Sequence, residues 1–186
     1  MKPQALVLGF GGVISRMLFE SHRLTEAALG LAPGTLRWRG PFDPAQHLLW
    51  RDMQTVIWPE AVAAIQAAQA TGIKRAVLSN ELALFYGSGF RQRLPLLVRF
   101  EVVVDSTHIG TLKPDPRAYQ ACAAELGLPA GACVFVDDQW SNVLGGQRAG
   151  LQTVHFDVMN PRASCDEALY VLGLARTAQP GSAARR

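Results

Sequence analysis

Cysteine, net charge and long hydrophobic runs are all scarce in this chain of 186 residues. Cys122, Cys133 and Cys165 are odd in number, widely spaced and without a Cys-x-x-Cys pair, which argues against a disulfide scaffold. We expect instead a reduced, cytoplasmic protein with buried thiols. No run approaches the length of a membrane span, and the short apolar run after Lys2 stops at Gly9. The sequence therefore predicts neither contact with a membrane nor a signal peptide.

The small net charge argues against nucleic acid as a partner. The formal net charge is +3, and the basic residues are scattered, apart from Arg185 and Arg186 at the end of the chain. Nucleic-acid-binding proteins carry a basic stripe that this sequence lacks, so we expect no nucleic-acid partner. Because 49% of the residues are hydrophobic, the chain can form one domain with an ordinary core and a small inserted subdomain.

Short apolar segments alternate with helical patterns along most of the chain. Strands are predicted at 5–8, 76–78, 101–104, 133–136 and 153–156. Helices are predicted at 59–70, 116–126, 142–149 and 161–172, most of them with a proline at the start or a glycine at the end. The strands mostly lack the polar alternation of a half-exposed sheet. The pattern predicts an α/β fold, with a Rossmann-like parallel sheet flanked by helices.

One long segment, residues 15–58, interrupts this alternation and looks helical, with Asp43 and Pro44 resembling a helix start. It holds three of the four tryptophans and five arginines: Trp38, Trp50, Trp58, Arg16, Arg23, Arg37, Arg39 and Arg51. We expect a small helical cap over one end of the sheet, the alternative being two helices packed in the core. The predicted organisation is a core of residues 1–14 and 59–176, a cap of 15–58 and a disordered tail of 177–186.

Polar residues follow the predicted strands at several points. They are the glycine-rich turn 9–12, Ser79 with Asn80, Lys113, and Asp137 with Asp138. In an open parallel sheet, ligands bind beyond the carboxyl ends of the strands, so we expect these residues to meet at one edge. A hydroxyl, an ammonium group and two adjacent carboxylates suit a phosphate bound together with Mg²⁺.

Each signal also has a plainer interpretation. The aspartate pair can be an exposed loop, Lys113 a surface lysine, and Ser79 with Asn80 a helix cap. Trp140 is either a wall of the pocket or an aromatic side chain of the core. The glycine-rich turn after the first strand is also typical of dinucleotide binding, but Ile14 stands where that fingerprint needs a small residue.

Together the polar segments resemble those of the haloacid dehalogenase (HAD) superfamily, in the same order and over nearly the whole chain. The matching segments are 76–80 for the second motif, 113–116 with Tyr119 for the third, and 134–138 with Asn142 and 149–150 for the fourth. The third segment is similar to that of the subgroup with a helical cap after the first strand. The resemblance implies Mg²⁺-dependent hydrolysis of a small phosphorylated metabolite through an aspartyl-phosphate. A 2-haloacid substrate is less favoured, because the acidic pair suits a metal-dependent phosphatase.

The first motif departs from the family pattern. Most members begin it with an aspartate that is both the nucleophile and a Mg²⁺ ligand, whereas this sequence reads Gly9-Phe10-Gly11-Gly12-Val13. By resemblance, Gly9 marks the place of a missing nucleophile. Losing a nucleophile can lower turnover by a factor on the order of 10⁶. Gly11 also leaves no proton donor at the position that serves as general acid in many phosphatases.

The resemblance therefore implies a site that lacks the nucleophile and the general acid but keeps the groups that bind phosphate and metal. Its catalytic positions are Gly9 and Lys113, its phosphate-binding residues are Ser79, Asn80, Lys113, Gly11 and Gly12, and its Mg²⁺ ligands are Asp137, Asp138 and the Gly11 carbonyl, with weakened affinity. The predicted cap is short for the subgroup, which would open the site to water. We expect an impaired or inactive hydrolase of a small phosphorylated or otherwise anionic metabolite. The alternatives are a non-catalytic binder of a phosphorylated ligand and metal, and an interaction protein that uses the aromatic-rich cap.

Overall fold

The computed structural model of the chain describes residues 1–16, 26–27, 30–35, 57–80, 82–83, 91 and 94–175. Most of the cap predicted at 15–58 and all of the tail predicted at 177–186 lie outside these residues. The predicted helix start at Asp43 and the tryptophans Trp38 and Trp50 lie outside them as well. The cap and its alternative of two core helices therefore stay predictions.

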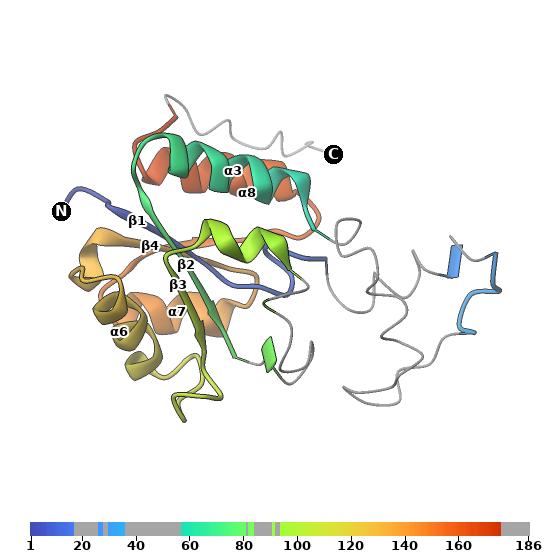
Figure 1. The fold of residues 1–186 in the computed structure, drawn as a ribbon, viewed down its shortest axis with the longest axis horizontal. Coiled ribbons are helices and arrows are strands. Elements are labelled where there is room, and N and C mark those ends of the chain that lie inside the picture. The colour runs from blue at the N-terminus through green and yellow to red at the C-terminus, as the bar shows by residue number, and fades with distance from the viewer. Residues whose placement is uncertain are drawn as a thin grey trace, which may run out of the picture.

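The core of the molecule is a parallel sheet. Its strands are β1 (Ala5–Leu8), β2 (Lys74–Ser79), β3 (Val102–Asp105), β4 (Cys133–Asp137) and β5 (Gln152–His155). They lie in the order β3-β2-β1-β4-β5, with β1 in the centre, and every neighbouring pair is parallel (Figure 1). All residues of β1 and β4 are buried, because both faces of the sheet are covered. The predicted parallel α/β fold is confirmed.

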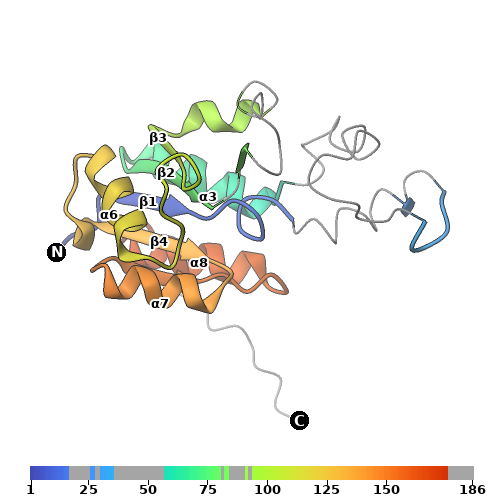
Figure 2. The same ribbon diagram turned by 90° about the horizontal axis from the view of Figure 1, so that it is seen from below.

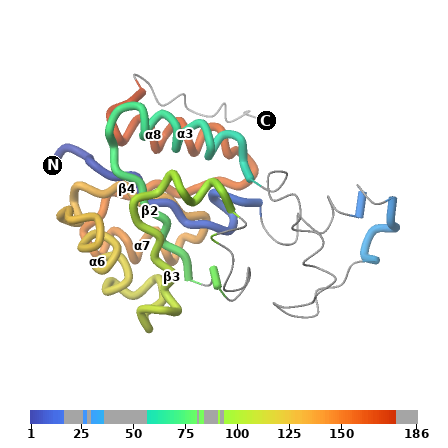
Figure 3. The backbone as a smooth tube through the Cα atoms, in the orientation of Figure 1, coloured from blue at the N-terminus to red at the C-terminus, as the bar shows by residue number. Residues whose placement is uncertain are grey.

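Helices cover both faces of this sheet. They are α3 (Pro59–Ala70), α6 (Pro116–Glu125), α7 (Trp140–Arg148) and α8 (Pro161–Val171), with short 3₁₀ helices η2 (Pro95–Arg99) and η3 (Ala130–Ala132). Figures 1 and 2 show α3 and α8 on one face and α6 and α7 on the other, and the tube in Figure 3 shows α3 running beside α8. The strand β1 contributes side chains to the hydrophobic cores on both faces of the sheet. Leu6 and Leu8 belong to the core cluster of α3 and α8, whereas Ala5 and Val7 belong to that of α6.

The helices begin as the sequence predicts, with one exception. Pro59, Pro116 and Pro161 each lie in the first turn of a helix, where the missing N–H costs no hydrogen bond. The helix predicted at 142–149 begins two residues earlier, at Trp140. The earlier start follows from the Asp137 carboxylate, which accepts a hydrogen bond from the Gln139 N–H and so fixes the turn directly after β4.

The strand register brings three carboxyl ends together. Leu8, the last residue of β1, pairs with Val77 of β2 on one side and with Val136 of β4 on the other. The residues that follow these strands therefore meet at one edge of the sheet, as the sequence predicts. Among the residues that the structure describes, no helix combines the length and hydrophobicity that crossing a membrane requires.

Candidate functional site

The turn after β1 packs directly against the end of β4. The Gly9 N–H donates a hydrogen bond to the Val136 carbonyl at 2.9 Å. A Cβ atom on Gly9 would lie 2.8 Å from Asp137 Oδ2 and 3.3 Å from Val13 Cγ2. Any side chain at position 9 therefore requires the Asp137 carboxylate to shift. The position that the sequence assigns to a nucleophile thus lies against the carboxylate that it assigns to a metal.

Lys113 and Asp137 form a buried ion pair at this place. Lys113 Nζ lies 2.5 Å from Asp137 Oδ2, and the two side chains are only 5% and 2% exposed. The ammonium group also lies 5.3 Å from the centre of the Phe135 ring, so the pair has an aromatic neighbour rather than water on that side. The cation predicted to hold phosphate is therefore bound to the carboxylate predicted to hold Mg²⁺.

The other oxygen of Asp137 is held by the start of α7. Oδ1 accepts hydrogen bonds from the Gln139 N–H at 3.0 Å and from Asn142 Nδ2 at 2.9 Å. The Tyr119 hydroxyl in turn donates to the Asn142 carbonyl at 2.7 Å. Burial, and then the charge of Asp137, raises the pKa of Tyr119, so its hydroxyl stays protonated and remains a donor. This network fixes the orientation of the Asp137 carboxylate.

Asn80 positions the backbone of Lys113. Its Oδ1 accepts from the Lys113 N–H at 2.7 Å, and its Nδ2 donates to the Lys113 carbonyl at 3.0 Å. Both polar atoms of the side chain that was predicted to bind phosphate thus fasten the Lys113 loop to the end of β2. The neighbouring Ser79 is the half-buried last residue of β2, and its carbonyl accepts from the Ser106 N–H at 2.7 Å.

Asp138 lies against the glycine turn. Gly12 has a φ of +82°, and a Cβ atom on it would lie 2.6 Å from Asp138 Oδ2, so both the backbone conformation and the space require glycine. Burial, and then the neighbouring charge of Asp137, raises the pKa of Asp138 from 3.8 to about 6. Gly11 is exposed on the same turn and forms a β-bridge with Ser15.

These groups fit a divalent cation only in part. Two adjacent carboxylates repel each other, and the charge of Asp137 contributes, after burial, to the raised pKa of Asp138; an oxygen-binding cation relieves that repulsion. However, Asp137 already has Lys113 on Oδ2 and two N–H donors on Oδ1. Among the described residues, no group of three or more His, Cys, Asp or Glu side chains could hold a metal. Protein ligands for Mg²⁺ would be the two aspartates with backbone oxygen, completed by water and phosphate.

An aromatic pair, exposed Trp140 and half-buried His155, flanks the acidic segment. The rings of Trp140 and His155 are stacked, with centroids 4.1 Å apart and an interplanar angle of 7°. His155 Nε2 lies 3.0 Å from the Asp138 carbonyl oxygen. Trp140 is 61% exposed, so the interpretation of this residue as a core side chain is wrong. The sequence offered no signal for His155, whose place opposite Asp137 follows from the β4–β5 register.

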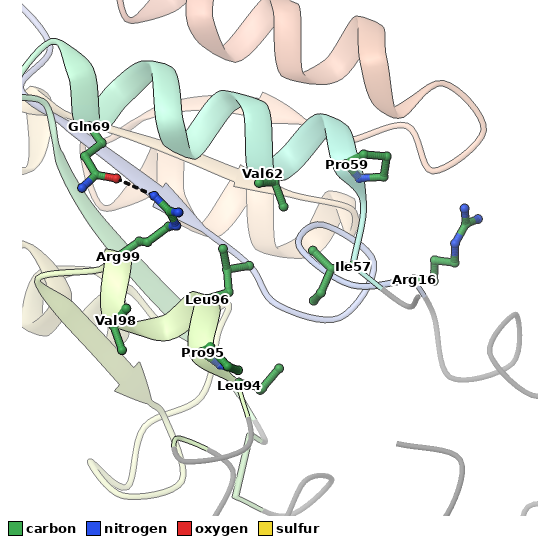
Figure 4. A pocket seen from close by; sticks show the side chains of 10 residues that line it. All are labelled: Arg16, Ile57, Pro59, Val62, Gln69, Leu94, Pro95, Leu96, Val98 and Arg99. Atoms are coloured by element: carbon green, nitrogen blue, oxygen red, sulfur yellow. Dashed lines mark hydrogen bonds between the residues drawn. The ribbon is translucent and has the colours of Figure 1, made fainter. Parts of the chain in front are cut away.

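A cavity of about 850 Å³ lies apart from these residues, between α3 and η2 (Figure 4). Its lining residues are Arg16, Ile57, Pro59, Val62, Gln69, Leu94, Pro95, Leu96, Val98 and Arg99. Arg99 donates a hydrogen bond to Gln69 Oε1 at 3.0 Å, and Arg16 lies 3.9 Å from the centre of the Trp58 ring. None of the predicted phosphate or metal residues lines this cavity, so it is not the predicted site.

Comparison with known proteins gives the class to which this fold and site belong. Residues 15–150 match the haloacid dehalogenase-like hydrolase family, and the chain belongs to that family. The matched range contains Ser79, Lys113, Asp137 and Asp138, and it begins after Gly9. The assignment of Gly9 to the nucleophile's place therefore depends on its position after β1 and on its contact with Asp137.

Individual relatives include phosphatases. The chain is 38% identical to Phosphatase MT3486 of Mycobacterium tuberculosis over 100 residues, which cover 54% of this chain and 46% of that protein. It is 35% identical to mouse acyl-CoA dehydrogenase family member 10 over 134 residues, which cover 72% of this chain and 12% of that protein. The chain thus spans less than half the length of either relative.

Solved structures share the fold over most of the chain. An uncharacterized protein of Corynebacterium glutamicum has a TM-score of 0.59 and 25% identity, covering 94% of this chain and 98% of its own. A HAD phosphatase from Thermococcus onnurineus has a TM-score of 0.61 and 19% identity, covering 84% of this chain and 86% of its own. At 19% identity, the second likeness concerns the fold alone.

Proposed function

We propose that this protein binds a small phosphorylated metabolite in a phosphatase-type HAD site but hydrolyses it very slowly, because Gly9 supplies no nucleophile. One observation carries the proposal. A Cβ atom at position 9 would lie 2.8 Å from the same Asp137 oxygen that holds Lys113. A carboxylate at position 9 would therefore lie beside the lysine and the aspartate with which the family's nucleophile acts.

The remaining groups can bind a phosphate ester without breaking it. The Ser79 hydroxyl, the Lys113 ammonium group and the backbone N–H of Gly11 would hold the phosphoryl oxygens, whereas the Gly12 N–H already donates to the Ser15 carbonyl at 2.8 Å. Asp137, Asp138 and the Gly11 carbonyl would hold Mg²⁺ with weakened affinity, and the cation, when bound, neutralises phosphoryl charge. Hydrolysis would then need direct attack by water, without a side chain at position 11 to protonate the leaving group.

The proposed organisation follows the predicted domain boundaries. Residues 1–14 and 59–176 would form the catalytic-type core, and residues 15–58 a reduced cap that contributes the contacts to the rest of the metabolite. We propose a cytoplasmic location, which suits three cysteines that are all free and buried. Burial raises the pKa of Cys133 to about 11, so this thiol is unreactive at neutral pH.

Restoring the carboxylate tests the proposal. The variant Gly9→Asp should hydrolyse p-nitrophenyl phosphate with Mg²⁺ at least about 10²-fold faster than the parent chain, a fraction of what a lost nucleophile costs. Gly9→Asn is the matched control, because its side chain displaces Asp137 as much but is no nucleophile, and it should stay at the parent rate. Equal rates for the parent and Gly9→Asp, or a folded Gly9→Asp without activity, would overturn the assignment of Gly9.

A further inference from the structure

The two charged groups of the proposed site neutralise each other. Lys113 Nζ and Asp137 Oδ2 are 2.5 Å apart in a place where both side chains are almost fully buried. Asp137 is the ion-pair partner of Lys113 among the residues that the structure describes. A buried charge that loses its partner is strongly destabilising, because neither water nor another charge compensates it. A ligand that takes only one of these groups therefore leaves the other uncompensated.

Only one side of this pair is free to move. The Asp137 carboxylate is held on Oδ1 by two donors from the start of α7. The Lys113 backbone is held on both its N–H and its carbonyl by Asn80. The lysine side chain has a flexible four-carbon stem, so the ammonium group can leave Asp137 while the backbone stays in place. The missing side chain at position 9 adds to this dependence, because glycine offers Lys113 no second carboxylate.

We propose that Lys113 and Asp137 exchange partners when the site fills, so that phosphate and Mg²⁺ each bind weakly alone and bind cooperatively together. Phosphate takes the ammonium group of Lys113, and Mg²⁺ takes Oδ2 of Asp137. Each ligand then replaces the charge that the other removes. The inference rests on the proposed function, since it uses the same phosphate and cation groups. Coupling between two ligands is reciprocal, so each raises the affinity of the other by the same factor.

Calorimetric titration of the full chain measures this coupling. Saturating inorganic phosphate should lower the dissociation constant of free Mg²⁺ by about fivefold or more, and saturating Mg²⁺ should lower that of phosphate by the same factor. An Mg²⁺ affinity that phosphate does not change would overturn the exchange. Because Mg²⁺ and phosphate also attract each other directly, two variants are needed to separate the causes.

Lys113→Met removes the internal cation, and Asp137→Asn removes the internal anion. Without phosphate, Lys113→Met should bind Mg²⁺ about fivefold or more tightly than the parent, and phosphate should then add little. Without Mg²⁺, Asp137→Asn should bind phosphate more tightly than the parent. Direct attraction alone predicts neither gain, so the absence of both gains in folded variants would overturn the exchange. If Lys113→Met does not fold, the Asp137→Asn titration alone decides the matter.

Arg117→Met is the matched control. Arg117 is a cation in the same segment that pairs with Asp115, but its side chain is 74% exposed. The variant should bind both ligands as the parent does. Failures of the two proposals are distinguishable. If neither the parent nor any variant binds phosphate but Lys113→Met gains Mg²⁺ affinity, the proposed phosphate binding is wrong. The conclusion that Lys113 competes with Mg²⁺ for Asp137 then stands. If the parent binds phosphate without any effect of Mg²⁺ and neither variant gains affinity, the exchange fails and the phosphate site stands.

Discussion

Lys113 and Arg117 lie four residues apart, and each forms an ion pair with an aspartate at nearly the same distance. Lys113 Nζ is 2.5 Å from Asp137 Oδ2, and Arg117 Nη2 is 2.7 Å from Asp115 Oδ2. Their surroundings differ: the first two side chains are 5% and 2% exposed, and the second two are 74% and 34% exposed. Burial, and not distance, decides how much a missing partner costs, because water can solvate only the exposed charges.

Disrupting the buried pair should have the largest effect on stability of the changes compared. Lys113→Met leaves the Asp137 carboxylate buried without a cation, and removing one partner of such a pair costs about 3–5 kcal/mol. Urea unfolding in EDTA at pH 7 measures the loss. The double variant Lys113→Met with Asp137→Leu should recover part of it, since neither position of the pair then carries a charge. A Lys113→Met protein as stable as the parent would mean that water reaches the pair, contrary to its burial.

Asp138 is intermediate in burial between the Lys113–Asp137 pair and the Arg117–Asp115 pair. It has no ion-pair partner among the described residues. Its folded-state pKa of about 6 is above the ordinary 3.8, so the folded chain holds a proton that the unfolded chain releases. Stability should therefore fall as pH rises from 3.8 to about 6. Asp138→Asn removes this dependence, so in EDTA it should be more stable than the parent at pH 7 and equally stable at pH 3.5.

Thermal unfolding of both proteins across that pH range checks the direction of the effect. A parent chain that is stabilised relative to Asp138→Asn as pH rises would contradict it. Such a result would mean that the ionised Asp138 gains more from Lys113 and His155, which favour its charged form, than it loses through burial and the charge of Asp137.

The exposed pair should have the smallest effect. Arg117→Met removes the cation, but the Arg117 N–H that Asp115 Oδ1 accepts at the start of α6 is a backbone group and stays. Hydrogen bonds from Arg117 lower the pKa of Asp115 from 3.8 to about 2. Any stabilisation by the pair is thus complete above pH 3.8 and disappears as pH falls toward 2. Unfolding midpoints at pH 7 should agree within error, and a clear loss there would contradict the ranking by burial.

The sequence could predict the fold because its signals are local. β1 and α3 have their predicted bounds. The apolar run of β1, and the proline at the start and glycine after the end of α3, are signals that depend on neighbouring residues alone. The convergence of Ser79 and Asp137 at one edge also followed, because both end parallel strands, whereas Lys113 reaches that edge from the loop after β3.

The contacts within the site could not be predicted, because they depend on side-chain directions. Nothing in the sequence indicated that Asn80 would hold the Lys113 backbone or that Lys113 would bind Asp137. The early start of α7 at Trp140 and the stacking on His155 likewise depend on contacts that form only in the folded chain.

The central claim is that position 9 is the place of the nucleophile, and acid-quench mass spectrometry tests it most directly. Gly9→Asp and the parent are mixed with p-nitrophenyl phosphate and Mg²⁺, quenched in acid and digested. One hydroxylamine-labile phosphoryl group is expected on residue 9 of the variant and none on the parent. A phosphoryl group on the parent chain, or one on Asp137 of the variant, would contradict it.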